Sequence, residues 1–366
     1  MAEVWQEQLD HFKSMIEQDI ADGLFYGAAV RVARGGNVVF DETIGSADGE
    51  GEKPLKKDSV FSIFSMTKAF TNVLTLRAIE QGRFALTTRV SEVIPEFSGH
   101  PRETATFYHL LTHTSGWPGL WEAKPGGYQG DFDETLNDVI ERVHGTLDPG
   151  LRCDYQHMIN HTLMGEALRR TDPKKRNLRD IYREDLFEPL AMQDTAMGVR
   201  KDLQTRHVVP DMRGNVPAVN PGRTKPGPYG MFEEEDAVMP HVGCVSTADN
   251  VLRFAEMLRR GGELDGARIL SPRTIERARQ NQTGEMVNEL YRWLALSNGA
   301  EGYPAYIGLG FSLKGEKFVH SQYGTLTGVG TFGNNGAGST IFWVDPEVDA
   351  TFVCLTAGVM DEWQNT

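Results

Sequence analysis

Strand-forming segments lie at both ends of this chain, and helix-forming segments lie between them. Near the N-terminus, residues 28–33 and 38–40 are apolar runs that flank Arg34-Gly35-Gly36-Asn37, a hairpin pattern. Near the other end, four runs rich in β-branched and aromatic residues follow one another: 306–311, 328–332, 340–344 and 351–355. The simplest arrangement is one antiparallel sheet built from both ends, with a helical lobe inserted between them.

This arrangement predicts an α+β fold in two lobes. Residues 1–84 and 241–366 are expected to form an α/β lobe, an antiparallel sheet flanked by helices. Residues 85–240 are expected to form a mainly helical lobe with long loops, among them the proline-rich segment 207–230. A length of 366 residues suits two lobes, and a cleft between lobes is a usual place for an active site.

Apolar residues at helical spacing mark the expected helices. These cover residues 4–20, 65–81, 103–113, 133–143, 157–170, 177–188, 247–260 and 271–281. In the second of them, the apolar positions follow the i, i+3, i+4 pattern of an amphipathic helix.

Composition excludes several classes of function. The net charge is −14 and the isoelectric point is about 5.2, which argues against nucleic-acid binding. No run approaches the roughly 20 apolar residues of a membrane helix, and no signal peptide is recognisable, so a cytoplasmic location is expected. Cys153, Cys244 and Cys354 are scattered, which predicts reduced thiols rather than a disulfide scaffold. The oligomeric state stays open, and a homodimer is possible.

The pair Ser65 and Lys68 carries the main chemical signal. Positions i and i+3 lie on the same face of a helix, and a serine in the first turn feels the positive end of the helix dipole. A lysine drawn into a cleft can lose its proton and then accept the proton of a serine. By itself this spacing is a weak signal. It gains weight because it opens a predicted helix directly after the apolar run 60–64.

Other chemistries find little support. The chain has no Gly-x-Ser-x-Gly nucleophile elbow, no phosphate-binding loop and no dinucleotide fingerprint. The i, i+4 pairs His109/His113 and His157/His161 have a spacing that can bind a metal, but no third ligand is obvious. We therefore expect neither a metal nor a cofactor.

Several segments resemble, in order, the serine β-lactamase and penicillin-binding-protein superfamily. The Ser65-x-x-Lys68 helix is similar to its first motif, and residues 109–116 (HLLTHTSG) resemble its Leu-Leu-Thr-His-Thr-Ser-Gly segment. The resemblance spans about residues 25 to 356, and its character is closest to family VIII esterases and class C β-lactamase-related hydrolases. It implies the β-lactamase/transpeptidase-like fold and makes Ser65 the expected nucleophile.

The second motif of this superfamily is Tyr-x-Asn. Tyr155 matches the tyrosine, which implies that its phenol moves a proton between Ser65 and the leaving group. His157 stands where the family has Asn. A neutral imidazole has one donor and one acceptor, so His157 can do the work of that amide or can simply pack in the loop.

The third motif corresponds to Asn334-Asn335-Gly336 on a strand beside the nucleophile. The resemblance implies an oxyanion hole made by the N–H groups of Ser65 and Ala337. The usual cationic or aromatic residue is missing, which argues against a substrate that carries a carboxylate, such as a β-lactam. Trp117 and Tyr229 are predicted to line an apolar pocket.

The expected function is hydrolysis of a carboxylic ester through an acyl-enzyme on Ser65, with Lys68 and Tyr155 as the base. Alternatives are a D-amino-acid peptidase or amidase, an acyltransferase or a weak β-lactamase. A small-molecule ester or amide is the expected partner. The alternative of another class is a penicillin-binding-like protein that binds a ligand without catalysis, suggested by the departures at His157 and Asn334.

Overall fold

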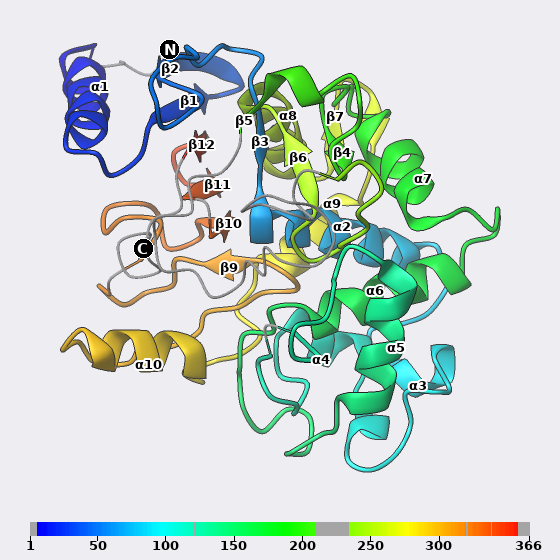
Figure 1. Ribbon diagram of the computed structural model, residues 1–366. Coiled ribbons are helices and arrows are strands. Elements are labelled where there is room, and N and C mark those ends of the chain that lie inside the picture. The colour runs from blue at the N-terminus through cyan, green and yellow to red at the C-terminus, as the bar shows by residue number, and fades with distance from the viewer. Residues whose placement is uncertain (1–5, 121, 209–233, 320, 338, 358–366) are drawn as a thin grey trace.

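The computed structural model describes residues 6–120, 122–208, 234–319, 321–337 and 339–357. Its central feature is a six-stranded antiparallel sheet in the order β2-β1-β12-β11-β10-β9 (Figure 1). The strands are β1 (Gly27–Arg34), β2 (Asn37–Gly45), β9 (Ser312–Leu313), β10 (Phe332–Gly336), β11 (Thr340–Asp345) and β12 (Ala350–Thr356). Strand β1 pairs with β12 along its length, so the predicted sheet made from both ends of the chain is confirmed.

The hairpin between β1 and β2 turns at two glycines. Gly35 and Gly36 have φ of +59° and +81°. Two successive residues with positive φ give the turn whose twist matches that of the flanking strands. The predicted hairpin is therefore present, although β2 continues five residues beyond the predicted end.

Helices cover both faces of the sheet (Figure 1). On one face α1 (Gln6–Ala21) packs through Ile16 against Val30 and Phe40. On the other face α8 (Ala248–Arg259) contacts β11 and β12, where Val353 and Leu355 are fully buried. The alternation of side chains along β12 thus divides its residues between two apolar layers.

The nucleophile's helix, α2 (Thr67–Glu80), runs through the middle of the molecule. It was predicted to be amphipathic, and this is wrong, because its polar side chains are buried as well. Asn72 donates to the carbonyl of Gly310 at 2.7 Å, and Thr75 donates to the carbonyl of Thr71 at 2.8 Å. These hydrogen bonds satisfy buried polar groups that the apolar spacing alone does not account for.

The central part of the chain is helical, as predicted. Its helices are α3 (Val90–Val93), α4 (Phe107–Leu111), α5 (Phe132–Arg142), α6 (Ile159–Arg170) and α7 (Leu178–Tyr182), which continues as a π-helical turn, η3 (Arg183–Phe187). The division into lobes at residues 84/85 and 240/241 stays a prediction. The predicted loop 207–230 lies almost entirely outside the described residues.

A second, four-stranded sheet has the order β4-β6-β3-β5 and was not predicted. Its strands are β4 (Ala196–Met197), β6 (Cys244–Ser246), β3 (Val60–Ser62) and β5 (His207–Val208). Strands of two or three residues are too short to show an alternating pattern. This sheet matters because β3 leads directly into the turn that carries Ser65.

Two predicted strands near the C-terminal end need correction. Of residues 328–332, only Phe332 lies in a strand, at the start of β10. Residues 306–311 are not a strand. A side chain at Gly308 would meet the Ala278 carbonyl oxygen at 1.9 Å, and Gly310 has φ of +83°, so the segment is an irregular close contact. The helices α9 (Pro272–Ala278) and α10 (Glu289–Ser297) follow one another, and α10 was not predicted.

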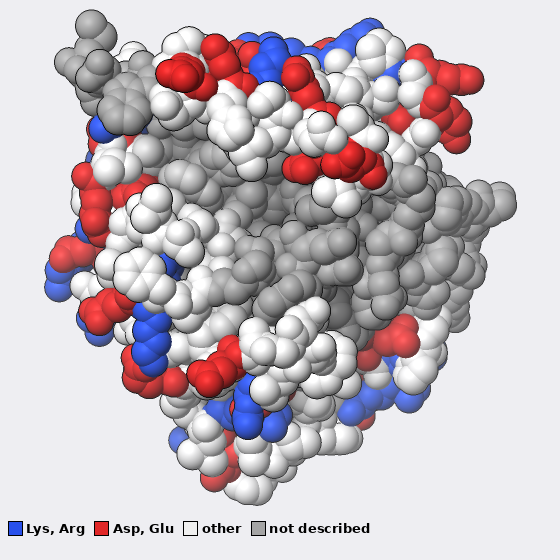
Figure 2. All heavy atoms as spheres, turned by 90° about the vertical axis from the view of Figure 1, so that its left-hand side faces the viewer, with Lys and Arg blue, Asp and Glu red and all other residues white. Residues whose placement is uncertain are grey.

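The surface carries many charges of both signs. On the face shown in Figure 2, acidic and basic side chains are interspersed around the periphery. Cys153, Cys244 and Cys354 are free thiols, as predicted. None of the helices in the described part of the chain is long and apolar enough to cross a membrane.

Candidate active site

Ser65 lies on a short 3₁₀ turn, η1 (Phe64–Met66), between β3 and α2. From Ser59 to Leu76 it is the one residue that is not buried. Its neighbour Phe64 has φ of +45°, a conformation that a bulky side chain rarely adopts and that costs energy. The strained turn therefore presents a single hydroxyl from an otherwise buried segment.

Lys68 lies directly beneath this hydroxyl. Its Nζ is 2.9 Å from Ser65 Oγ and 2.9 Å from the carbonyl oxygen of His241, and the side chain is 1% exposed. The i, i+3 spacing thus brings the two groups into hydrogen-bond contact, as the sequence suggested. The carbonyl of His241 fixes the direction of the ammonium group from the other side.

Tyr155 completes a group of three side chains from different parts of the chain. Its ring centroid is 5.3 Å from Lys68 Nζ, and the ring stacks on His113 with centroids 4.9 Å apart. The Tyr155 N–H donates to Asn288 Oδ1 at the start of α10, at 3.3 Å. The tyrosine is therefore held by a residue that lies 133 positions further along the chain.

Four buried histidines surround Lys68, namely His113, His157, His161 and His241. Burial lowers the pKa of each of them, and the positive charge of Lys68 lowers it further. For His113 the pKa falls to about 3. All four imidazoles are therefore neutral at pH 7.

Hydrogen bonds fix which nitrogen carries the proton in two of these rings. His161 Nε2 lies 3.1 Å from Asn72 Oδ1 and His241 Nε2 lies 2.9 Å from Gln129 Oε1, so both are donors to amide oxygens. His113 Nδ1 instead accepts from the Gln156 N–H at 2.9 Å. The surroundings of the lysine are thus polar and ordered.

His157 lies against the proposed proton carrier. Its ring is 5.2 Å from the Tyr155 ring and nearly perpendicular to it, and only 6% of the residue is exposed. His157 therefore packs edge-to-face on the tyrosine ring. The substrate-binding role of His157 stays a prediction.

The predicted third motif lies beside the nucleophile. A side chain at Gly336 would meet the Ile63 carbonyl oxygen at 2.3 Å and Phe64 Cβ at 3.1 Å, and Thr340 Oγ1 donates to that same carbonyl at 3.1 Å. Glycine is therefore required where β10 approaches η1. Ala337 follows at once, so its N–H is close in sequence to this contact.

The Asn-Asn-Gly segment occupies an open part of the sheet. Strand β9 pairs with β10 only at Phe332 and Gly333, so among the described strands none pairs with residues 334–336 on that side. Asn334 stands opposite Phe342, which faces the main core, and Asn335 therefore points to the other face of the sheet. The substrate-binding roles of Asn334 and Asn335 stay predictions.

One of the two predicted pocket residues lies in the core. Trp117 is fully buried, donates to Asn160 Oδ1 at 3.0 Å and packs edge-to-face on Phe97, so the prediction that it lines an open pocket is wrong. An indole with one satisfied N–H is well suited to a core. Tyr229 lies outside the described residues.

The histidine pairs considered for a metal have other partners. His109 Nδ1 is bonded to the backbone N–H of Thr106 at 3.1 Å, whereas His113 lies under Tyr155. Within the described ranges, no group of three or more His, Cys, Asp or Glu side chains is placed to hold a metal ion.

Comparison with known proteins agrees with this geometry. The sequence profile of the family described as Beta-lactamase matches residues 12–362. The chain belongs to the beta-lactamase family. It is a serine hydrolase of that family, related to known esterases.

Two relatives illustrate the esterase side of the beta-lactamase family. Esterase/beta-lactamase LipL of Mycobacterium tuberculosis is 27% identical over 356 residues, which cover 90% of this chain and 77% of that protein. Esterase EstB of Burkholderia gladioli is 26% identical over 278 residues, covering 67% of this chain and 69% of that protein.

Solved structures confirm the β-lactamase/transpeptidase-like fold. A penicillin-binding protein homologue from Caulobacter crescentus superposes with a TM-score of 0.79 at 24% identity, covering 98% of this chain and 94% of that one. EstCE1, described as a hydrolase with promiscuous acyltransferase activity, gives 0.77 at 20% identity, covering 98% and 96%.

Proposed function

We propose that this beta-lactamase-family hydrolase cleaves a carboxylic ester through an acyl-enzyme on Ser65, with Lys68 and Tyr155 as the base. The observation that carries the proposal is the 2.9 Å contact between Lys68 Nζ, which is buried, and the hydroxyl of Ser65, the one accessible residue of its segment. A nucleophile in hydrogen-bond contact with a base is the arrangement that covalent catalysis requires.

The first half of the reaction forms the acyl-enzyme. Lys68, after losing its proton, accepts the Ser65 proton while Oγ bonds to the carbonyl carbon of the ester. The N–H groups of Ser65 and Ala337 hold the oxygen that becomes negative. The bond to the alcohol oxygen then breaks, and Tyr155 passes the proton to that oxygen, so a neutral alcohol leaves.

The second half releases the acid. Water attacks the acyl carbon and gives its proton to the same base. The base then returns that proton to Ser65 Oγ as the bond between Oγ and the acyl carbon breaks. If an alcohol takes the place of water, the same steps transfer the acyl group. The acyltransferase alternative therefore differs from the esterase only in the acceptor, and EstCE1 is described as having both activities.

Labelling with a fluorophosphonate tests the nucleophile, because this probe reacts with activated serines. Wild type is expected to gain one adduct on Ser65, and Ser65→Ala is expected to gain none. Ser62→Ala is the matched control, because Ser62 is buried three residues earlier and bonded to His207 Nε2 at 2.9 Å. Equal labelling of Ser65→Ala and wild type would contradict the proposal.

A substrate panel tests the type of reaction. p-Nitrophenyl acetate and butyrate, nitrocefin and D-alanine amides separate an esterase from a β-lactamase and from a peptidase. We expect the esters to be turned over fastest, because Asn334 brings no charge to the motif that would bind a β-lactam carboxylate. A protein that forms no adduct with any reactive ester would instead be the non-catalytic ligand binder.

A further inference from the structure

A small cavity lies between α10 and β9, apart from the Ser65 turn. Its volume is about 40 Å³. That is room for one or two water molecules or one small polar group. The side chains that line it include Tyr291, Tyr303, Tyr306, Lys314, Ser321 and Tyr323. It is therefore a largely aromatic cavity with one cation.

The cation is unusual in its burial. Lys314 is only 3% exposed, and its Nζ donates to the carbonyl oxygen of Lys317 at 3.2 Å. Among the described residues no carboxylate lies within ion-pair distance of Lys314. By contrast, the side chain of Lys317 is half exposed and pairs with Glu285. A buried ammonium group without a counter-charge is costly, so the cavity is well suited to an anion.

Two tyrosines in the cavity wall bear on ligand binding, Tyr303 through its hydroxyl and Tyr306 through its strained backbone. The Tyr303 hydroxyl has no acceptor among the described residues, and burial raises its pKa, so it keeps its proton as a donor. Tyr306 has φ of +44° and its ring packs against Gly315. Backbone strain of this kind is concentrated at ligand-binding positions.

Two elements that line the cavity also contact residues of the candidate active site. Tyr291 on α10 has its ring centroid 6.3 Å from that of Tyr155, and Asn288 at the start of α10 accepts from the Tyr155 N–H. On the other side, Leu313 of β9 pairs with Phe332, two residues before Asn334. The elements α10 and β9 therefore contribute both to the cavity and to contacts with residues of the candidate site.

We propose that this cavity binds a carboxylate of the substrate, so that the enzyme prefers half-esters of dicarboxylic acids. Lys314 supplies the charge and the Tyr303 hydroxyl a hydrogen bond. The inference rests on the proposed esterase function and names its substrate class. It also replaces the expectation drawn from Asn334, because the missing cation of the third motif is supplied from the neighbouring strand.

Kinetics with matched esters test the cavity. The p-nitrophenyl half-esters of succinate, glutarate and adipate are compared with neutral p-nitrophenyl butyrate. For the best spacer, Lys314→Met is expected to lower the ratio of kcat/KM for the anionic ester to that for the neutral ester by about 20-fold, the effect of one charge-assisted hydrogen bond. Lys314→Arg should restore much of the ratio, and Lys317→Met, three residues on, should leave it as in wild type.

Equilibrium binding separates this proposal from the function it rests on. Monomethyl glutarate is titrated calorimetrically into Ser65→Ala, where no turnover occurs. Saturable binding that Lys314→Met abolishes supports the cavity, even if wild type cleaves no ester and the esterase proposal fails. Ester turnover with a ratio unaffected by Lys314→Met, and no such binding, overturns the cavity and leaves the esterase intact.

A second variant covers the case in which Lys314→Met does not fold. Tyr303→Phe keeps the ring and removes only the hydroxyl. It is expected to lower the same ratio several-fold without changing the melting temperature. An unchanged ratio and unchanged binding of monomethyl glutarate in Tyr303→Phe would count against the proposal. Preference for a sulfonate or phosphate analogue over the carboxylate would also overturn it.

Discussion

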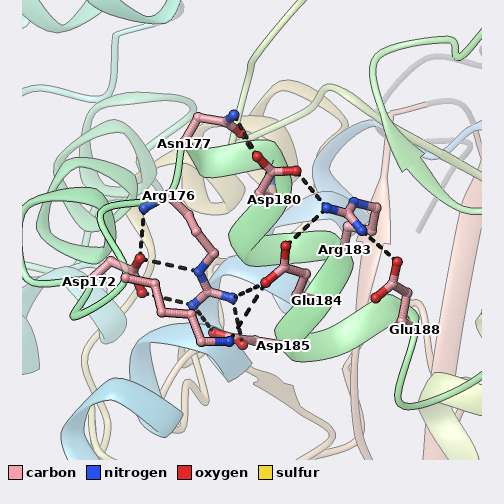
Figure 3. Close-up of polar contacts among 9 residues, drawn as sticks. Asp172, Arg176, Asn177, Asp180, Arg183, Glu184, Asp185 and Glu188 are labelled. Carbon is pink, nitrogen blue, oxygen red and sulfur yellow. Dashed lines mark hydrogen bonds and ion pairs between the residues drawn. The ribbon is translucent and has the colours of Figure 1, made fainter.

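Two cations in this molecule, the partly buried Arg176 and the fully buried Lys68, have opposite surroundings. Arg176, between α6 and α7, contacts the carboxylates of Asp172, Glu184 and Asp185 (Figure 3). The hydrogen bonds that Arg176 donates to Asp185 and Asp172 hold its pKa far above the usual range. Lys68 instead donates to the hydroxyl of Ser65 and to a peptide carbonyl, amid neutral imidazoles.

The contacts of the two cations suit different roles: Arg176 stabilises the fold, whereas Lys68 is placed to take part in the reaction. A guanidinium that bonds to three carboxylates stays charged at any pH the protein meets. The Lys68 amine instead lies in hydrogen-bond contact with an alcohol, which is the arrangement that lets an amine exchange a proton with a nucleophile. Only the second kind of site can exchange protons with a reacting group.

The largest effect is expected from removing the chemical cation. Lys68→Met keeps the length of the side chain but has no basic nitrogen, so kcat for the best ester should fall by at least about 1000-fold. Melting temperature should change little. Lys174→Met in the ionic cluster is the control and should retain wild-type kcat, since Lys174 is exposed. Retention of most activity in Lys68→Met would show that Lys68 is not the base.

Replacing Arg176 should have the opposite effects, a loss of stability with little change in kcat. Arg176→Met leaves Asp172 and Asp185 without their partner, and such a loss costs about 3–5 kcal/mol of unfolding free energy. Urea denaturation measures this, and kcat below the transition should match wild type. Arg183→Met is the comparison within the same cluster. Because Arg183 is half exposed, its pairs with Asp180 and Glu188 should contribute under about 1 kcal/mol each.

Acidic pH should lower the stability of the fold through histidines whose pKa is lowered in the folded protein. The pKa of His113 is about 3 and that of His207 about 4 in the folded protein, against an ordinary value of 6.5. Between pH 6.5 and about 4 the unfolded chain therefore binds protons that the folded chain does not. Stability is complete above pH 6.5 and falls by about 1.4 kcal/mol per pH unit for each such histidine.

Urea denaturation at a series of pH values measures this slope. His113→Gln should reduce it by the contribution of one histidine. A stability that stays constant from pH 6.5 to 4.5 would contradict the neutral state of the buried imidazoles.

The smallest effect is expected at the contact between β10 and the nucleophile turn. Thr340→Val removes the hydrogen bond to the Ile63 carbonyl, which should cost about 1 kcal/mol of stability and lower kcat several-fold by loosening the oxyanion hole. Thr171→Val is the control, because it loses a bond to the Ala167 carbonyl far from Ser65. Equal losses of kcat in both variants would contradict the idea that Thr340 positions the turn that carries Ser65.

The sequence predicted the architecture and the central pair of the site. Hydrophobic spacing located most helices and the hairpin, and the position of Ser65 relative to Lys68 followed from the geometry of a helix. It did not reveal the four-stranded sheet, whose strands are too short to alternate. It missed α10 as well, although Asn288 and Tyr291 bring that helix against Tyr155.

The features of the site that the sequence did not predict depend on contacts between segments far apart in the chain. His241 reaches Lys68 through its backbone carbonyl, and no sequence pattern distinguishes a carbonyl that accepts a catalytic hydrogen bond. Trp117 was assigned to a pocket because aromatic residues in loops often line pockets, but its indole N–H found a partner in Asn160 inside the core. Lys314 belongs to no recognisable motif, and only its burial in the structure distinguishes it from other lysines.

The pairing of β1 with β12 has a consequence for synthesis of the protein. Strand β1 is made more than three hundred residues before its partner β12. While the chain emerges from a ribosome, the apolar edge of the hairpin stays uncovered until β12 is released. The sheet that holds β10 against the Ser65 turn is therefore completed only after β12 has emerged, and chains that terminate before β12 should be both inactive and prone to aggregate.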